Sequence, residues 1–521
     1  MGKTKSNIIS PSILFLIFAI LIGGYIRLAQ AIPSPFPLND GGLFYTMTQD
    51  LIANNWRIPA YTTYNHLNIP FAYPPLGFYL AGFISQSIGW ELLDIFRILP
   101  AVFSLLTIPA FYIFATNFVK DDWELGIATL IFALVPPSFT WLIMGGGVTR
   151  ALASFLSLLT LSRIYHLYIK RSKGNILITA ILASLTILSH PETALHTAIG
   201  ALILFLFFGR NKIAFLKSII VLTLILIITS PWWVTVISNH GFSPFVAAGQ
   251  TGWYTSDSII NLLTFDISYE NGLQTIGVFS FVGIFWNLSK KRYIFPIWFI
   301  LLYVCDPRNA PQDLTPLMAI LSSTVLFEVF RVFSKHRPRE ESVIKPPLDH
   351  PIVKFFFAIL VCQWIFSSMA TTSYVGYKTV LTQDDHDAFE WVKNNTVANS
   401  SFFILSGNSP LMDPISEWFP ALTNRRSVNT IQGHEWLKDE NFGKNLESSS
   451  KAQDCFSQTP DCILNWASNN QEQVNYIFLR KVPQQCGDDQ FYSSGLYKLL
   501  KEHSMFKEVY TTNEISIFQI D

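Results

Sequence analysis

Long apolar runs separated by short polar loops dominate the chain from residue 11 to about residue 370. An α-helix needs about 20 mostly apolar residues to cross the hydrocarbon core of a bilayer, and many of these runs approach that length. A shorter run, residues 76–90, is interrupted by polar side chains. The other runs predict eleven membrane-spanning helices, at roughly residues 11–31, 98–118, 125–143, 151–169, 175–189, 193–209, 218–237, 272–288, 293–304, 315–333 and 352–370.

Positive charges in the loops indicate how the spans are oriented. Three loops each carry three Lys or Arg residues and no acid, which is typical of the cytoplasmic side; they are 170–173, 210–217 and 290–292. When the spans are counted back from these loops, an N-terminus with Lys3 and Lys5 is cytoplasmic only if 76–90 does not cross the membrane. We therefore expect 76–90 to be an interfacial helix on the membrane surface or a re-entrant helix. The segments expected on the outer face are 136–150, 190–192, 238–271, 305–314 and everything after residue 371.

The last part of the chain has a different pattern. Polar residues return, and short β-like runs at 402–405, 475–479 and 515–518 alternate with helical stretches at 385–394 and 493–503. This alternation predicts a small α/β domain outside the membrane. We therefore divide the chain into a transmembrane domain, residues 1–370 with its first outer loop at 31–97, and an extracytoplasmic α/β domain, residues 371–521.

Composition agrees with a membrane protein. Of the 521 residues, 50% are hydrophobic and only 14% are charged, whereas soluble domains carry about 25% charged residues. The 36 basic and 36 acidic residues balance, so the charge gives no indication of nucleic-acid binding. Five cysteines are too few for a disulfide framework. Outside the cytoplasm Cys455 and Cys462 have two equally acceptable states, a disulfide or two free thiols.

The first outer loop contains the leading candidate for chemistry. Asp40 follows the first apolar run, and Leu43, Met47 and Leu51 then recur at the spacing of an amphipathic helix. A carboxylate at the outer surface is suited to act as a general base towards an acceptor hydroxyl. The alternative is that Asp40, or the preceding Asn39, caps the helix that follows, since both residue types are favoured at that position.

Four further side chains are expected on the same face. Arg150 follows three glycines at the start of a helix, where backbone N–H groups and a cation hold an anion; the alternative is a flexible turn with Arg150 reaching the lipid headgroups. His190 and Glu192 join two short apolar runs, either as a polar hairpin turn or as part of an outward cavity. Tyr73 begins Tyr73-Pro74-Pro75, which closes the first loop in an extended turn.

Arg308 is the only cation of its outer loop, and Asp306 and Asp313 flank it. It is expected either to pair with one of these acids or to bind a phosphate. In the α/β domain, Arg425 and Arg426 are expected either as acceptor contacts or, more simply, on a solvated surface.

Two absences restrict the function. The predicted spans carry no acid or base near their midpoints, although ion-coupled transporters usually need ionisable groups there. The sequence also lacks Asp-x-Asp, a glycine-rich phosphate loop and His/Cys metal-ligand spacing. We therefore expect no metal and no cofactor.

Taken together, the acid after the first span, the amphipathic helix and Pro-Pro-Leu at 74–76 in a chain of many spans resemble the GT-C superfamily of polytopic glycosyltransferases. This superfamily includes protein O-mannosyltransferases, aminoarabinose transferases and the oligosaccharyltransferase catalytic subunit. The resemblance covers roughly residues 1–335. It implies an α-helical membrane protein of about eleven spans in the cell membrane.

The resemblance also implies a reaction. A sugar would pass, with inversion, from a lipid-linked polyprenyl-phosphate donor to a glycan, lipid or protein acceptor on the outer face. Asp40 matches the position of the family's catalytic acid, and Arg308 lies where members often have an arginine, so it is the candidate for the donor phosphate. Metal-using members have a second acid within 136–150, where this chain has Gly-Gly-Gly-Val-Thr-Arg, which favours a metal-free monosaccharide transferase.

Two other functions stay open. One is a non-catalytic relative that binds lipid-linked glycan on the same scaffold. The other, which the missing midplane charges disfavour, is a lipid-glycan transporter.

Overall fold

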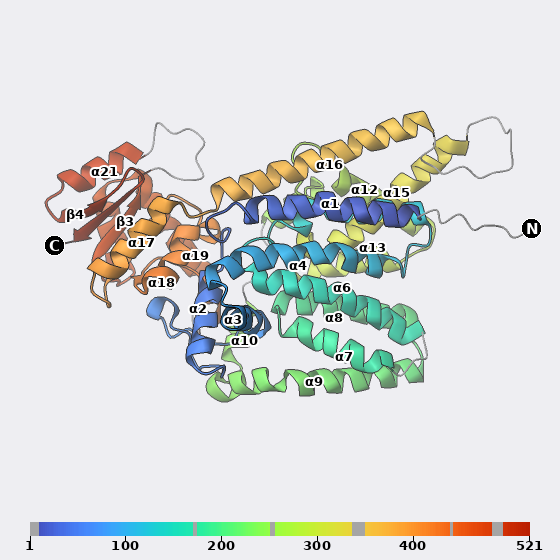
Figure 1. The fold of residues 1–521 in the computed structure, drawn as a ribbon, viewed down its shortest axis with the longest axis horizontal. Coiled ribbons are helices and arrows are strands. Elements are labelled where there is room, and N and C mark those ends of the chain that lie inside the picture. The colour runs from blue at the N-terminus through green and yellow to red at the C-terminus, as the bar shows by residue number, and fades with distance from the viewer. Residues whose placement is uncertain are drawn as a thin grey trace, which may run out of the picture.

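We describe the protein from a computed structural model that covers residues 10–169, 174–250, 256–335, 350–437, 441–481 and 493–520. A bundle of long helices forms most of the molecule, and a small α/β domain lies at one end of it (Figure 1). The bundle helices, in chain order, are α1 (Pro11–Ala31), α4 (Leu92–Ala115), α5 (Asp122–Leu134), α6 (Gly147–Ile169), α7 (Gly174–Ile187), α8 (Pro191–Phe208), α9 (Lys212–His240), α12 (Thr275–Ser289), α13 (Ile294–Cys305), α15 (Thr315–Lys335) and α16 (Pro351–Lys378).

Each of the eleven expected spans overlaps one of these helices, although the span expected at 125–143 extends beyond α5, which ends at Leu134. Seven helices in the described part of the chain are long and apolar enough to cross a membrane: α1, α4, α6, α8, α9, α15 and α16. Helices α7, α12 and α13 are apolar but shorter. The chain is therefore a multi-pass membrane protein, and a total of eleven spans stays a prediction.

The first loop contributes two helices of another orientation, α2 (Gly42–Ala53) and α3 (Leu76–Ile88). Figure 1 shows α3 nearly end-on, whereas α1, α4, α6 and α9 run across the view. Helix α3 therefore lies across the direction of the long helices. This is the orientation that a helix resting on the membrane surface would have.

Small residues allow close approach between the bundle helices. A Cβ atom at Gly126 of α5 would lie 2.6 Å from the ring of Phe15 on α1, and one at Gly200 of α8 would lie 2.5 Å from the ring of Trp298 on α13. Association of helices inside a membrane depends on such packing, because lipid tails are as apolar as the helix surfaces.

The α/β domain is built on a five-stranded sheet with the order β2-β1-β3-β5-β4. Strands β1, β2 and β3 are parallel, and β5 runs antiparallel to both β3 and β4. The strands are β1 (Ser401–Leu405), β2 (Arg426–Ser427), β3 (Tyr476–Arg480), β4 (Phe506–Thr511) and β5 (Ile515–Ile520). The helices are α17 (Gln383–Asn395), α18 (Pro414–Thr423), α19 (Phe442–Asp454), α20 (Pro460–Asn469) and α21 (Ser493–Glu502).

Helices cover both faces of this sheet. Phe402 and Ile404 of β1 pack in one apolar cluster with α17 and α18, while Phe403 and Leu405 pack in another with α19, α20 and α21. This is the period of two that a strand imposes on its side chains. Cys455 and Cys462 form a disulfide beside the second cluster, so of their two expected states the bonded one is present.

The structure places Arg425 differently from the simpler of its two expected positions, a solvated surface. The residue is only 7% exposed, so that interpretation is wrong. Its guanidinium donates to the Thr396 hydroxyl and to backbone carbonyls of Lys393, Thr396, Thr423 and Asn424. Arg425 therefore stabilises the turn before β2. Arg426 is half-buried and pairs with Glu472 at 2.7 Å.

The domain packs directly on the bundle and on the first loop. The apolar cluster that contains Phe402 and Trp418 continues into Phe36, Phe96 and Val148 of the membrane part. Helices α2 and α18 are in contact (Figure 1). This packing brings α18 next to the loop that carries Asp40.

Candidate functional site

Asp40 and Arg150, the first two candidates, are in direct contact. The Asp40 carboxylate accepts a hydrogen bond from the backbone N–H of Gly146 at 3.0 Å. Arg150 Nη2 lies 3.0 Å from Oδ1 and 2.7 Å from Oδ2 of the same carboxylate. The anion expected at the glycine-led start of α6 is therefore the carboxylate of Asp40, and Arg150 is held in an ion pair.

The helix-cap interpretation of Asp40 is wrong. Helix α2 begins after Gly41, and no side chain caps its N-terminus. Asn39 does not cap it either, since its amide Nδ2 lies 3.5 Å from the sulfur of Met144 and 3.8 Å from that of Met412. Asp40 instead turns away from its own helix and towards α6, 110 residues further along the chain.

Glycine is required where these two segments meet. Gly41 has φ +125°, a conformation that other residues rarely adopt. A Cβ atom at Gly146 would lie 2.6 Å from Asp40 Oδ2 and 2.9 Å from Arg150 Nη1, and one at Gly145 would collide with the Asp40 carbonyl oxygen. The three glycines therefore allow the turn before α6 to approach the Asp40 loop closely. A flexible turn is not needed to explain them.

Arg150 keeps one donor group unused. Its Nε and Nη2 both donate to the Trp141 carbonyl, at 3.3 and 3.2 Å, and its guanidinium lies 5.6 Å from the centre of the Trp141 ring. Within the described part of the chain Nη1 makes no hydrogen bond. The side chains of Asp40 and Arg150 are 18% and 15% exposed, so the pair is partly exposed.

Tyr73 supports the same turn from behind. Its hydroxyl lies 3.3 Å from the Thr149 hydroxyl, which itself donates to the Gly146 carbonyl at 3.0 Å. Burial raises the pKa of Tyr73, so its phenol is neutral. The ring packs 5.6 Å from Trp436 of the α/β domain and 6.2 Å from the His190 ring.

His190 acts as the cap of α8. Its Nδ1 accepts the backbone N–H of Thr193 at 3.2 Å, and its Nε2 lies 3.8 Å from the Glu192 carboxylate. Burial, together with the positive charge of Arg150, lowers the pKa of His190 to about 3. The imidazole is therefore neutral at pH 7 and offers no cation to a phosphate. Glu192 is half-buried beside it.

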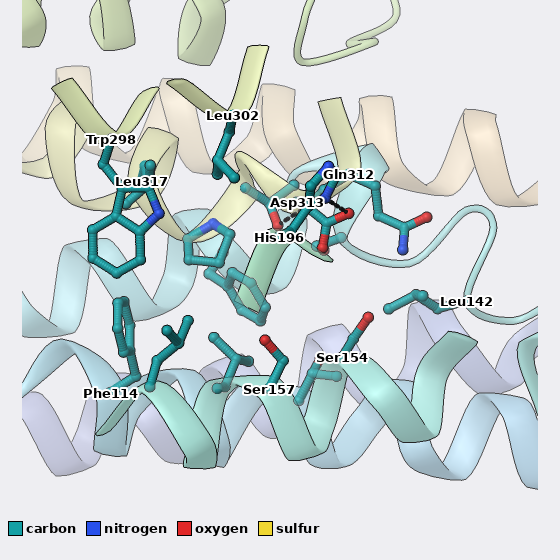
Figure 2. Close-up of a pocket in the computed structure, with 17 residues that line it drawn as sticks. Phe114, Leu142, Ser154, Ser157, His196, Trp298, Leu302, Gln312, Asp313 and Leu317 are labelled. Atoms are coloured by element: carbon teal, nitrogen blue, oxygen red, sulfur yellow. Dashed lines mark hydrogen bonds and ion pairs between the residues drawn. The ribbon is translucent and has the colours of Figure 1, made fainter. Parts of the chain in front are cut away.

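The two aspartates that flank Arg308 contact a histidine. His196 of α8 has Nε2 at 3.3 Å from Asp306 and Nδ1 at 2.5 Å from Asp313, the last residue of α14 (Ala310–Asp313). Figure 2 shows His196 and Asp313 on one side of a cavity, opposite Ser154 and Ser157 of α6. No local pattern around His196 singles it out as a site residue.

The cavity beside His196 is small and lies apart from the Asp40–Arg150 pair. Its volume is about 50 Å³, enough for a water molecule or two, and neither Asp40 nor Arg150 lines it. Arg308 is exposed, and its positive charge offsets part of the effect of burial on the pKa of Glu435. A contact between Arg308 and a donor phosphate stays a prediction.

Glu417 is a further acid at the Asp40 loop. It belongs to α18, and its Oε1 accepts the backbone N–H of Gly41 at 2.7 Å across 376 residues of chain. The residue is 6% exposed. Burial, together with the nearby charge of Asp40, raises its pKa to about 8. Glu417 is therefore largely neutral at pH 7.

The residues around Asp40 do not fit a metal ion. Within the described ranges there is no group of three or more His, Cys, Asp and Glu side chains that could hold one. Both oxygens of Asp40 contact the Arg150 guanidinium, a cation that a metal would have to displace. We therefore derive no step through a metal.

Sequence comparisons give no family for this chain. No protein-family model matches it. No curated protein matches it in sequence.

Solved structures do match. The archaeal oligosaccharyltransferase AglB from Archaeoglobus fulgidus, in complex with an inhibitory peptide and a dolichol-phosphate, aligns with a TM-score of 0.56 and 13% identity over 90% of this chain and 69% of that one. ArnT from Cupriavidus metallidurans, bound to undecaprenyl phosphate, aligns with a TM-score of 0.54 and 13% identity over 97% of both chains. The chain has a GT-C-like fold.

Another GT-C-like match has a longer chain. The arabinofuranosyltransferase AftD from Mycobacteria aligns with a TM-score of 0.52 and 12% identity over 97% of this chain and 40% of that one. All three matched proteins are GT-C glycosyltransferases. At this level of identity the likeness concerns the GT-C fold, and the chemistry rests on the residues described above.

Proposed function

We propose that this protein is an inverting membrane glycosyltransferase that moves a sugar from a polyprenyl-phosphate donor to an acceptor at the outer membrane surface. The observation that carries the proposal is the Asp40–Arg150 pair. Asp40 is not used as a helix cap, the pair is partly exposed, and Arg150 Nη1 makes no hydrogen bond within the described ranges. Two of the GT-C structures described above hold dolichol-phosphate or undecaprenyl phosphate, which supports the same class of donor.

Asp40 is proposed as the general base. The acceptor oxygen attacks the anomeric carbon on the side opposite the phosphate, and its proton passes to a carboxylate oxygen of Asp40. The new glycosidic C–O bond forms while the C–O bond to the phosphate breaks. The polyprenyl phosphate leaves with the bonding electron pair, and the sugar is inverted.

Arg150 is proposed to hold the leaving phosphate. Its Nη2 binds Asp40 at 2.7 Å, while Nη1 of the same planar group is available to a phosphate oxygen. One guanidinium would thus set the spacing between the base and the leaving group, and its charge would stabilise the phosphate as negative charge builds up there. Arg308, exposed near Glu435, is proposed as a second contact for the donor.

Tyr73, His190 and Glu192 are proposed as the polar wall of the substrate groove. Tyr73 and His190 are neutral, so they would contact sugar hydroxyls more readily than the phosphate. The domain after α16 is proposed to lie outside the cytoplasm. The disulfide between Cys455 and Cys462 supports this placement, because disulfides persist in oxidising compartments.

The test is transfer of radiolabelled sugar from a panel of polyprenyl-phosphate sugars in membranes that contain the wild type or Asp40→Asn. Asparagine keeps the size of the side chain but cannot accept the proton. We expect transfer by the wild type and a loss of about a hundredfold or more in Asp40→Asn, at an equal level of folded protein. Equal transfer by both proteins would remove Asp40 as the base, and no transfer with any donor would favour a non-catalytic glycan-binding protein.

A further inference from the structure

The α/β domain holds the backbone on both sides of Asp40. Before Asp40, the carbonyl of Asn39 accepts the indole N–H of Trp418 at 2.8 Å. After it, the N–H of Gly41 donates to the carboxyl of Glu417 at 2.7 Å. Adjacent residues of α18 thus hold the residues on each side of the proposed base.

The fit between α18 and the first loop is close. A Cβ atom at Gly42 would lie 2.5 Å from the Glu417 carbonyl oxygen and 3.2 Å from the Cα of Trp418. The Tyr64 hydroxyl donates to the same Glu417 carbonyl at 2.7 Å. A side chain at position 42 would therefore clash with residues 417–418, so the close contact requires glycine there.

A second set of contacts fastens the loop to the edge of the sheet. The side chain of Asn65 donates to the Ser427 carbonyl at 2.9 Å and accepts the Ser427 N–H at 2.7 Å, as a neighbouring strand would. His66 Nε2 lies 3.0 Å from Asn424 Oδ1. The first loop and the α/β domain thus form one continuous hydrogen-bonded unit.

We propose that Glu417 is a positioning residue for Asp40, so that the catalytic centre is complete only when the α/β domain is docked on the first loop. This inference rests on the proposed function. Glu417 does not contact Asp40 through its side chain in the hydrogen bonds described; it acts through the backbone of Gly41.

The protonation state of Glu417 is central to this role. Its carboxyl faces Asp40 of the first loop, Arg150 of α6, Tyr64 of the first loop and Glu435 of its own domain. Burial raises the pKa of Glu417 to about 8, so at pH 7 it is a neutral acceptor for the Gly41 N–H. Above that pH it becomes a second carboxylate beside Asp40, and repulsion would shift the base.

The experiment compares Glu417→Gln and Glu417→Ala with the wild type in kcat and KM for sugar transfer between about pH 6 and about pH 10. Glutamine keeps an acceptor oxygen but does not titrate, so we expect activity within about threefold of the wild type at pH 7 and no loss of activity above about pH 8. Alanine removes the acceptor, so we expect kcat to fall about thirtyfold or more with a smaller change in KM.

Glu435→Gln is the matched control. Glu435 is a half-buried acid of the same domain whose pKa is also raised by burial. It accepts the N–H of Gly433 at 2.9 Å and does not hold the Asp40 loop. We expect Glu435→Gln to keep the alkaline loss of activity. Glu417→Ala with the kcat of the wild type, or Glu417→Gln with an unchanged alkaline limb, would overturn the proposal.

Thermal unfolding of the full chain in detergent gives a readout that does not depend on the donor. The folded protein holds the Glu417 proton more tightly than the unfolded chain, so this contribution to stability is complete below about pH 4.5 and is lost as pH rises to about 8. We expect the Tm of the wild type to fall over this window and the fall to be smaller in Glu417→Gln. Identical slopes would contradict the docked, neutral Glu417 even if no donor gives transfer and the proposed function fails.

Discussion

Two clusters of acids and cations in this protein are similar in composition. They differ in how exposed they are and in whether a hydrogen-bonding group remains available. Asp40 and Arg150 are 18% and 15% exposed, and one nitrogen of the guanidinium makes no hydrogen bond within the described residues. His196 is 3% exposed and has one aspartate against each ring nitrogen, Asp306 at 3.3 Å and Asp313 at 2.5 Å. The first cluster is open to a ligand, whereas the second is filled by its own members.

This difference distinguishes residues that act in a reaction from residues that stabilise the fold better than charge alone does. A buried group with all its partners in place contributes mainly when one partner is removed, because the other is then left unpaired at a cost of about 3–5 kcal/mol. An accessible pair with an unused donor can bind and release a substrate at little cost to the fold. We therefore expect substitutions in the first cluster to change the rate, and substitutions in the second to change stability.

The largest effect on rate that we expect, apart from that of Asp40 itself, is at Arg150. Arg150→Ala removes both the partner of Asp40 and the proposed phosphate contact, so transfer should fall by about a hundredfold to a thousandfold. The rate of Arg150→Lys should lie between those of Arg150→Ala and the wild type, because an ammonium group cannot bridge Asp40 and a phosphate as a planar guanidinium does. Initial rates at saturating donor are the measurement, with Arg426→Ala as a control for the loss of an arginine. A wild-type rate in Arg150→Ala would contradict the proposal that Arg150 holds the leaving phosphate.

A smaller effect is expected at Gly146. A Cβ atom there would lie 2.6 Å from Asp40 Oδ2, so Gly146→Ala should displace the carboxylate. We expect a loss of about tenfold in rate and of about 1–3 kcal/mol in the free energy of unfolding. Gly495→Ala is the control, since nothing lies within 4 Å of a Cβ atom at Gly495. Equal rates and equal stability for Gly146→Ala and the wild type would show that the close approach is not needed.

The smallest effect is expected at His190. Asn also caps helices, so His190→Asn should keep α8 intact and change the rate by less than about threefold. The pKa of His190 is lowered to about 3, so the unfolded chain binds its proton more tightly and this contribution to stability is lost as pH falls from about 6.5 to about 3. The fall in Tm on acidification should therefore be smaller in His190→Asn. A rate that drops steeply below about pH 7 in the wild type alone would make His190 a functional base.

The membrane helices could be predicted because the length of an apolar run is a local property. Each predicted span overlaps a helix, and the pattern of the α/β domain predicted β1, β3 and β5. Strand β2 was missed because two residues are too short to show a period, and β4 because Lys507 and Glu508 interrupt its apolar pattern. Their pairing depends on neighbours far away in the chain.

For the candidate site, too, the residue types could be recognised from the sequence, whereas their long-range contacts could not. Asp40 and Arg150 could be recognised from their residue types, but their contact joins segments 110 residues apart and no local pattern encodes it. Glu417 lies 376 residues from Gly41, and no local pattern connects the two positions. Buried Arg27 was also missed, because its partners on other segments are the hydroxyls of Ser104 and Ser138 and the carbonyl of Ala133, which carry no charge to pair with.

The most direct test of the central claim measures transfer rate and Tm together for Asp40→Asn and His196→Gln. We expect Asp40→Asn to lose about a hundredfold or more in rate with a Tm close to that of the wild type. We expect His196→Gln to keep its rate per folded molecule while its Tm falls, because Asp306 and Asp313 lose their shared partner. The opposite pattern, with an active Asp40→Asn and a folded but inactive His196→Gln, would contradict the assignment and move the chemistry to the buried cluster.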